Sequence, residues 1–437
     1  MKALFIRTDQ IGDMILLTPT FSLLKEALPH SIISVLGRPY TQPLLIGNYD
    51  VDEFIIGRPI KHREFDAILH AYNEFPYVLM GFLKGIKYRV ADRSKILFSF
   101  LNNVSSRQKF GDIRYHEVEQ DLFLVKALLE KLNVPYPEDF SPELKLAVPQ
   151  KQAPFELKEE TIGIHPGTGR GNRSWPIEKY SKLVDLISQK HPQAQIILTG
   201  GKSEFMNNQK ISDLCEKKPV NAAGQTDLET LIVLISKMRC FISVDTGPMH
   251  IAAALKRPVV AISPVKYVKP IRWGPYKTEQ VIVRNTTACG LRCNPYKCGL
   301  NICMDAITPE MVLEGVEKIY SGHAVPADKF KEYHIKTSAN ILIYDDTQDK
   351  RGRKYFDALS RDGYQVNYSN LIPAPTSLAR NDINFIHVFS KKAEIIFKLM
   401  RPFVSPFISN PPVIYLDKGT PEDRGEKIME EYLKNGN

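Results

Sequence analysis

Residues 241–255 combine a strand pattern, a polar turn and the start of a helix, an arrangement that can bind an anion. Phe241 to Val244 is short and mostly apolar, and Pro248 suits the first turn of a helix. The polar part of the segment consists of Asp245, Thr246, Gly247 and His250. The unpaired N–H groups at the helix start, together with the helix dipole, would face a phosphate. In the alternative interpretation, the Asp–Thr pair only caps an ordinary helix.

Strand and helix patterns alternate through the first part of the chain. Strands are predicted at residues 3–7, 31–36, 53–56 and 65–69, and helices at residues 14–28 and 115–132. This alternation is typical of a parallel sheet with helices on its faces. A stretch rich in Pro, Lys and Glu follows at residues 133–160 and indicates a linker.

The same pattern restarts after the linker. Strands are predicted at residues 161–165, 195–199, 241–244, 259–262 and 280–283, and helices at residues 177–190, 204–215, 226–238 and 248–255. We therefore expect two Rossmann-like α/β domains, at residues 1–155 and 156–330, that face a cleft. Ligands in such sheets bind beyond the carboxyl ends of the strands, where Asp245 and the Pro166–Gly167 turn would lie.

A third, smaller α/β segment is expected at residues 335–437. Strands are predicted at residues 341–345, 364–368, 385–389 and 413–416, and helices at residues 351–362 and 393–400. The segment resembles half of a Rossmann-like domain but carries no phosphate-loop signature, so its role stays open.

The composition excludes several classes of protein. Hydrophobic residues make up 43% and charged residues 24% of the chain, which argues against wholesale disorder. A transmembrane helix is not expected, because no run of about 18 uncharged apolar residues occurs. Arg7 and Asp9 come too early for a secretory signal peptide, so a cytoplasmic protein is predicted.

Positive charge is concentrated between Lys84 and Tyr115. Eight basic and two acidic residues in this segment account for +6 of the formal charge of +9. Because the segment also contains the apolar stretch Ile96 to Leu101, it could contact anionic lipid or a phosphorylated acceptor. A solvated basic face around a core helix is the alternative. Nucleic acid is not expected as a partner, since no nucleic-acid-binding module accompanies the charge.

Five motifs lie at the predicted strand ends and helix starts. They are Arg7-Thr-Asp-Gln-Ile-Gly-Asp13, His165-Pro-Gly-Thr168, Arg173-Ser-Trp-Pro176, Thr199-Gly-Gly201 and Asp245-Thr-Gly-Pro-Met-His250. Together they resemble the family 9 glycosyltransferases, the lipopolysaccharide heptosyltransferases, over about residues 1–320. The resemblance implies a GT-B fold, inverting transfer of heptose from ADP-heptose to the lipopolysaccharide inner core, and no cofactor or essential metal.

The resemblance also implies roles for individual residues. Asp13 matches the family's general base, with Asp9 as the competing carboxylate and helix capping as the structural alternative. The implied donor-binding residues are Gly167, Thr168, Arg173, Glu204, Asp245, Thr246, Gly247 and His250. Arg173 stands where the family usually has Lys, which keeps the charge but changes its shape. The alternatives are an exposed loop position for Arg173, a plain helix start for Glu204, and packing against its strand for His250.

We therefore expect an inverting glycosyltransferase that moves a heptose from a nucleotide-diphosphate donor, ADP-heptose, to a lipid-linked or core oligosaccharide acceptor. A nucleotide-sugar epimerase with GT-B architecture is one alternative, and a non-catalytic sugar-nucleotide-binding scaffold is another. The expected partners are the donor, the acceptor and, through peripheral contact, the anionic inner membrane at its cytoplasmic face.

Four of the six cysteines are close together in the sequence: Cys289, Cys293, Cys298 and Cys303. In a cytosolic protein, such a cluster favours a metal site or redox-sensitive thiols over structural disulfides. The spacing lies near that of structural zinc sites, so zinc is one interpretation and free thiols in a loop are the other.

Overall fold

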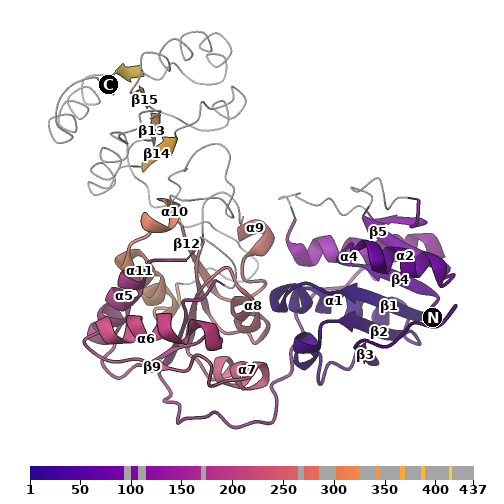
Figure 1. The fold of residues 1–437 in the computed structure, drawn as a ribbon, viewed down its shortest axis with the longest axis horizontal. Helices are drawn as coiled ribbons and strands as arrows, with labels where there is room; N and C mark the ends of the chain where they lie inside the picture. The colour runs from indigo at the N-terminus through magenta and orange to yellow at the C-terminus, as the bar shows by residue number, and fades with distance from the viewer. Residues whose placement is uncertain are drawn as a thin grey trace.

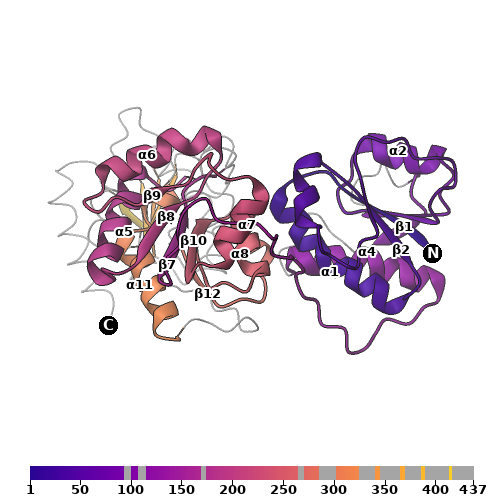
Figure 2. The same ribbon diagram turned by 90° about the horizontal axis from the view of Figure 1, so that it is seen from below.

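The protein is represented by a computed structural model that describes residues 1–92, 100–106, 115–168, 174–263, 270–284 and 302–323, together with four later strands. Two α/β domains lie side by side, the N-terminal one in indigo and purple and the C-terminal one in magenta and orange (Figure 1). Figure 2 shows the same pair after a turn of 90°. The expected boundary at residue 155 stays a prediction, although the strands of the two sheets lie on either side of it.

The N-terminal sheet has six parallel strands in the order β3-β2-β1-β4-β5-β6. Its strands are β1 (Lys2–Arg7), β2 (Ile32–Gly37), β3 (Glu53–Ile55), β4 (Ala67–His70), β5 (Tyr88–Asp92) and β6 (Val104–Ser106). Its helices are α1 (Ile11–Ala27), α2 (Phe75–Leu83) and α4 (Glu117–Leu132), with the 3-10 helix η1 (Pro39–Leu44). This is the strand order of a Rossmann fold, in which a ligand site is expected at the reversal between β1 and β4.

The C-terminal sheet repeats that order as β12-β11-β10-β7-β8-β9. Its strands are β7 (Thr161–His165), β8 (Gln195–Leu198), β9 (Val220–Asn221), β10 (Cys240–Val244), β11 (Val259–Ile262) and β12 (Gln280–Val283). Its helices are α5 (Ile177–Lys190), α6 (Phe205–Leu214), α7 (Leu228–Ser236), α8 (Gly247–Ala254), α9 (Pro270–Trp273), α10 (Ile302–Asp305) and α11 (Pro309–Tyr320), with the 3-10 helix η2 (Lys202–Glu204). The reversal point in this sheet lies between β7 and β10, which are parallel neighbours.

Helix α1 lies at the contact between the two domains. It packs against α4 of its own domain and against α8 of the other, and both views place α8 beside α1 (Figures 1 and 2). Nearly all of its residues from Gly12 to Leu24 are buried, as expected for a helix that is covered on several sides. Met14 of α1 and Met249 of α8 belong to one apolar cluster, so the core of the N-terminal domain continues into the contact between the domains.

The sequence predicted most of these elements. The predicted strands and helices of the first two domains are all present, with bounds that differ by a few residues. Several elements were missed: α2, β5, β6, β9 and the short or late helices η1, η2, α9, α10 and α11. Of the third segment, the four predicted strands are confirmed as a parallel sheet of order β14-β13-β15-β16.

The strands of this third sheet are β13 (Asn340–Tyr344), β14 (Gln365–Ser369), β15 (Phe385–Val388) and β16 (Val413–Tyr415). The helices predicted at residues 351–362 and 393–400 lie outside the described residues. None of the helices in the described part of the chain combines the length and the apolar character that crossing a bilayer requires.

Candidate active site

The starts of α1 and α8 meet where the two domains touch, and glycines make the close approach possible. A Cβ added at Gly12 would lie 2.6 Å from Cδ2 of His250, and one added at Gly247 would lie 2.9 Å from Cβ of Ile11. Real Cβ atoms do not come this close to other atoms, so glycine is required at both positions. The structure thus brings the turn that contains Asp13 next to the turn that begins at Asp245.

Both oxygens of the Asp13 carboxylate accept hydrogen bonds. Its Oδ1 accepts a hydrogen bond from Nη2 of Arg7 at 2.9 Å, and its Oδ2 accepts one from the backbone N–H of Gln10 at 3.3 Å. Gln10 is the N-cap of α1, so Asp13 does cap the helix, as the structural alternative requires. The side chain keeps 16% of its surface exposed, so capping and contact with a ligand are compatible.

Arg7 is the centre of a buried cluster of charges that the sequence analysis did not identify. Its side chain is 2% exposed and faces four carboxylates, which belong to Asp9, Asp13, Glu117 and Asp121. The nearest contacts of Arg7 measure 3.0 Å to Asp9, 2.9 Å to Asp13, 3.8 Å to Glu117 and 3.2 Å to Asp121. Burial disfavours the charge on Arg7, but Asp121 and the other carboxylates outweigh it and raise the pKa of Arg7.

Two carboxylates of this cluster, Asp9 and Asp121, have raised pKa values. Burial raises the pKa of Asp9 to about 7, with Asp13 and Glu117 adding to the effect and Arg7 opposing it. Burial also raises the pKa of Asp121, for which Arg7 is the main opposing charge. Arg7 therefore does not offset all of these acids, and part of the cluster holds protons near neutral pH.

The C-terminal domain reaches this cluster through α9. Nε of Arg272 is 2.8 Å from Oε2 of Glu117, and both side chains are buried. Next to this ion pair, His116 accepts at Nδ1 from the N–H of Val118, so its Nε2 carries the proton that it donates to the carbonyl of Gly274 at 3.0 Å. Burial, opposed by the bond to Gly274 and aided by Arg272, lowers the pKa of His116 to about 4, so this histidine is neutral.

The turn before α8 leaves part of the helix start open to a ligand. Thr246 is the N-cap residue, but within the described part of the chain its hydroxyl caps none of the first N–H groups of α8. Instead, its Oγ1 lies 3.0 Å from Oγ of Ser243. Pro248 has no N–H, and the N–H of Met249 donates to the carbonyl of Thr246 at 3.1 Å, so within the described residues the N–H of Gly247 is the group at this turn that a ligand can use. The interpretation of the Asp–Thr pair as a simple cap is not supported at Thr246.

His250 takes a position that neither sequence interpretation described. It packs against Gly12 of the other domain, and its Nε2 is 3.8 Å from Oδ1 of Asp245, too long for a hydrogen bond. Burial lowers the pKa of His250 to about 3, with a smaller contribution from His116. The imidazole is therefore neutral and forms part of the contact between the domains.

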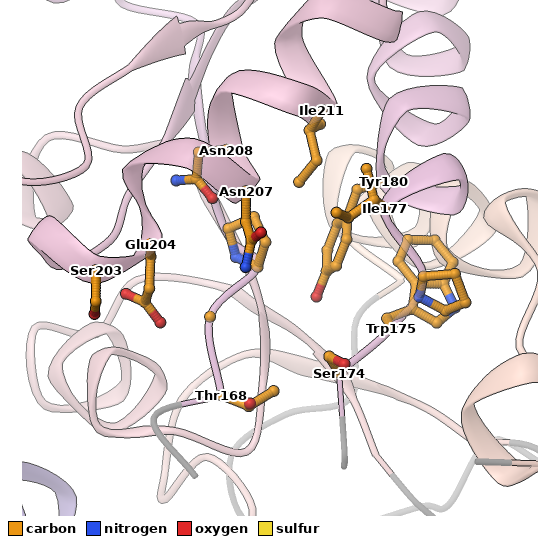
Figure 3. A pocket seen from close by; sticks show the side chains of 13 residues that line it. Thr168, Ser174, Trp175, Ile177, Tyr180, Ser203, Glu204, Asn207, Asn208 and Ile211 are labelled. Carbon is orange, nitrogen blue, oxygen red and sulfur yellow. The ribbon is translucent and has the colours of Figure 1, made fainter. Parts of the chain in front are cut away.

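A cavity of about 380 Å³ opens at the carboxyl ends of β7 and β8 and is shown in Figure 3. It brings together three of the predicted donor-binding residues, Gly167, Thr168 and Glu204. Oε2 of Glu204 accepts from the N–H of Gly201 at 2.7 Å, and a Cβ at Gly167 would lie 1.7 Å from Oε1 of Glu204. Glu204 thus starts its helix, as the structural alternative proposed, and also lies directly over the loop after β7.

Buried polar atoms line the same cavity. The hydroxyl of Tyr180 points into it, and Asn207 and Asn208 lie across from it (Figure 3). Neither Oη of Tyr180 nor Oδ1 of Asn208 has a hydrogen-bond partner among the described residues. Burial raises the pKa of Tyr180, which keeps its hydroxyl as a donor. A ligand with both donors and acceptors would satisfy these groups.

Several predicted site residues lie outside the described residues: Arg173, Cys289, Cys293 and Cys298. Cys303 is described and is buried at the start of α10. Among the residues that the structure describes, no group of three or more His, Cys, Asp or Glu side chains is arranged to hold a metal ion. The zinc interpretation therefore stays a prediction. Parts of the basic segment, residues 93–99 and 107–114, also lie outside the described residues.

Comparison with known proteins identifies the family. The model of glycosyltransferase family 9 (heptosyltransferase) matches residues 54–299. Lipopolysaccharide heptosyltransferase 2 of Salmonella typhimurium is 26% identical over 74% of this chain and 100% of its own length. Lipopolysaccharide heptosyltransferase 2 of Escherichia coli is 27% identical over 60% of this chain and 82% of its own length.

Solved structures agree on the fold. A family 9 glycosyltransferase from Veillonella parvula superposes with a TM-score of 0.61 at 19% identity, over 74% of this chain and 97% of its own. The ADP-heptose lipopolysaccharide heptosyltransferase II of E. coli superposes with a TM-score of 0.58 at 24% identity, over 74% and 99%. With two Rossmann-like domains in contact at the starts of α1 and α8, the chain has the GT-B fold and belongs to glycosyltransferase family 9, the heptosyltransferase family.

Proposed function

We propose that this glycosyltransferase moves a heptose from ADP-heptose to a lipopolysaccharide inner-core acceptor, with inversion at the anomeric carbon. The observation that carries the proposal is the position of Asp13, which Arg7 orients at the start of α1 in contact with the start of α8. Relatives that match over 60% or more of this chain are named as lipopolysaccharide heptosyltransferases, which supports the substrates.

In the proposed reaction, a hydroxyl of the acceptor attacks the anomeric carbon as the bond from that carbon to the diphosphate breaks. Asp13 takes the proton of the attacking hydroxyl as general base. The electron pair of the broken bond leaves with ADP, whose added negative charge is stabilised by the N–H of Gly247 and the dipole of α8. Arg7 acts on Asp13 by fixing its orientation, which general-base catalysis requires.

The donor is proposed to lie along the carboxyl ends of the C-terminal strands. The diphosphate would contact the backbone at Gly167, Thr168 and the turn from Asp245 to Gly247, with Arg173 adding positive charge. Glu204 would face the ribose from the cavity between α5 and α6. The cavity supports this placement because it lies at Gly167 and Thr168 and supplies buried polar atoms that have no hydrogen-bond partner among the described residues.

The test is a transfer assay with ADP-heptose and a heptose-deficient core acceptor. Replacing Asp13 with Asn keeps the side-chain shape and removes the base, so turnover should fall by about 10²–10⁴-fold while ADP binding persists. Incubation with the donor alone separates the alternatives: an isomerised nucleotide sugar would identify an epimerase, and binding without turnover by any acceptor would identify a scaffold. Undiminished turnover by Asp13→Asn would remove Asp13 from the mechanism.

We also propose that the N-terminal domain contacts the anionic surface of the inner membrane, where a lipid-linked acceptor is anchored. Helix α2 exposes four apolar side chains, Phe75, Pro76, Phe82 and Leu83. Cationic side chains surround its C-terminal end: Lys61, Arg63, Lys84 and Lys87. Apolar residues ringed by Lys and Arg are typical of surfaces that bind anionic lipid.

The position of α2 favours this surface. The hydroxyl of Thr8, which follows β1, donates to Oε2 of Glu74 at the start of α2, at 2.6 Å. The start of α2 is therefore bound to the loop that leads to Asp13, and its other end carries Phe82, Leu83 and the cationic side chains. An acceptor anchored in the membrane below Leu83 would have its sugars on the side of the general base.

A further inference from the structure

We infer that Arg272 is a positioning residue. The carboxylates about Arg7 are then correctly arranged only while the two domains are in contact. Arg272 acts on Asp13 through Glu117 and Arg7. The inference rests on the proposed role of Asp13, and it adds a residue from the C-terminal domain to the charge cluster about Arg7, whose other members come from the N-terminal domain.

The first step is that Glu117 is shared between two domains. Its Oε2 is 2.8 Å from Nε of Arg272, and its Oε1 is 3.8 Å from Nη2 of Arg7. The side chains are 7% exposed for Glu117, 10% for Arg272 and 2% for Arg7. A carboxylate this deeply buried depends on its cationic partners, because removing one of them leaves charge without compensation.

The second step is that Glu117 and Asp13 face the same nitrogen of Arg7. Nη2 of Arg7 is the atom bonded to Asp13 at 2.9 Å, and it is also the atom nearest to Glu117. Nη1 is engaged with both oxygens of Asp121 and with the carbonyl of Ala71. By engaging Oε2, Arg272 holds Glu117 at the longer distance, so Nη2 remains directed at Asp13.

The third step is that the surrounding groups do not replace Arg272. His116 on α4 and His250 on α8 have pKa values lowered to about 4 and about 3, so neither is a cation at neutral pH. Of the other charged groups near the cluster, Asp9 lies beside Arg7 and Asp121 lies on α4, whereas the cation Arg38 donates to the backbone carbonyl of Thr8. Among the described residues, Arg7 and Arg272 are the cations paired with Glu117.

Separation of the domains would remove Arg272 from Glu117. Glu117 would then depend on Arg7 alone and compete with Asp13 for Nη2. The carboxylate of Asp13 would lose its fixed orientation while the domains are apart and regain it when they meet. The proposed general base is therefore fully arranged only in the state in which donor and acceptor are held together, a form of induced assembly of the site.

The experiment compares three variants of the full-length protein. Arg272→Gln removes the cation. Arg272→Lys keeps the positive charge without the planar guanidinium group, and Lys256→Gln is the matched control. Lys256 also forms an ion pair between the C-terminal domain and the linker, with Glu143. Unlike Arg272 and Glu117, these two side chains are about half exposed, and neither belongs to the cluster about Arg7. The control thus tests whether any weakened contact has the same effect.

The readouts are transfer rates between pH 5 and pH 9, the KM of the acceptor, and the Kd of ADP. For Arg272→Gln we expect the acidic limb of the rate profile to move up by about one pH unit, so that kcat on that limb falls by up to about tenfold. The direction follows because loss of a cation raises the pKa of neighbouring carboxyls. The Kd of ADP should change by less than about twofold, and Arg272→Lys should recover part of the rate. Lys256→Gln should match the wild type.

A rate profile for Arg272→Gln that matches the wild type, or a change that Lys256→Gln reproduces, would overturn the inference. A second readout does not depend on activity: the melting temperature of each variant is measured from pH 5 to pH 9. Its pH dependence should change for Arg272→Gln and not for Lys256→Gln, even if the wild type transfers no heptose. Failure of the proposed function and failure of the inference are thereby distinguished.

Discussion

Gly12 of α1 and His250 of α8 are in direct contact across the two domains, with no room for a side chain on the glycine. Replacing Gly12 with Ala should therefore hold the domains apart, because the new Cβ would lie 2.6 Å from a buried ring. We expect a larger radius of gyration by small-angle scattering and a transfer rate lowered by about tenfold or more. Gly201→Ala is the control, since its Cβ would meet nothing nearer than 3.7 Å. Unchanged scattering by Gly12→Ala would show that the contact is not tight in solution.

Asp9 gives the protein a stability that depends on pH. Its pKa is raised to about 7 in the folded state, above its unfolded value, so the folded state binds the proton more tightly. The resulting stabilisation is present at acidic pH and is lost as pH rises through about 7. Asp9→Asn mimics the protonated form, and it should raise the free energy of unfolding at pH 8 by about 1–3 kcal/mol relative to the wild type, with a smaller gain at pH 5. Urea denaturation at both values measures this, and an equal gain at both would contradict it.

Position 167 must be glycine because the carboxylate of Glu204 occupies the space that a Cβ would take. A methyl group at Gly167 would overlap Oε1 of Glu204, so Gly167→Ala should displace the carboxylate and weaken ADP binding by about tenfold. Titration calorimetry with ADP measures the loss. The double variant Gly167→Ala/Glu204→Ala removes the overlap, so it should regain the melting temperature but not the affinity. If the double variant regained both, Glu204 would have no part in donor binding.

The exposed end of α2 should contribute most of the binding of this protein to lipid vesicles. Phe82→Ser/Leu83→Ser removes two apolar side chains, 47% and 64% exposed, and should lower binding to phosphatidylglycerol vesicles by about tenfold or more. Leu214→Ser is the matched control, because Leu214 is 56% exposed on the other domain. Binding of the wild type should weaken as the salt concentration rises above about 0.1 M. Equal losses for the α2 variant and the control would remove α2 from the membrane contact.

The sequence could predict elements with a clear apolar period. The strand Thr161–His165 and the helix Ile177–Lys190 were located with their observed bounds, because each is bordered by polar or proline-containing turns. Helix α2 was missed since its nine residues, Phe75 to Leu83, are almost all apolar and show no helical alternation. β5 and β6 were missed because they are short and carry charged or hydroxyl side chains.

The site was predictable only where it lies in short motifs. The turns at Asp13 and at Asp245 to Gly247 could be located because each follows a strand and starts a helix. The cluster about Arg7 could not, since Arg7 and Asp121 are 114 positions apart and Glu117 and Arg272 are 155 positions apart. One signal was present: an arginine that ends a buried strand must be matched by acids elsewhere in the fold.

Each sheet takes all of its strands from one continuous stretch of sequence, and this has a consequence for synthesis on the ribosome. The N-terminal domain can fold before α9 is made, since domains fold in order as the chain emerges. At about 5–20 residues per second, the 155 residues between Glu117 and Arg272 correspond to a delay of roughly 8–30 s. During that interval Glu117 of the nascent domain faces Arg7 but lacks Arg272. The charge balance of the site is thus completed in the last stage of folding, when the second domain docks.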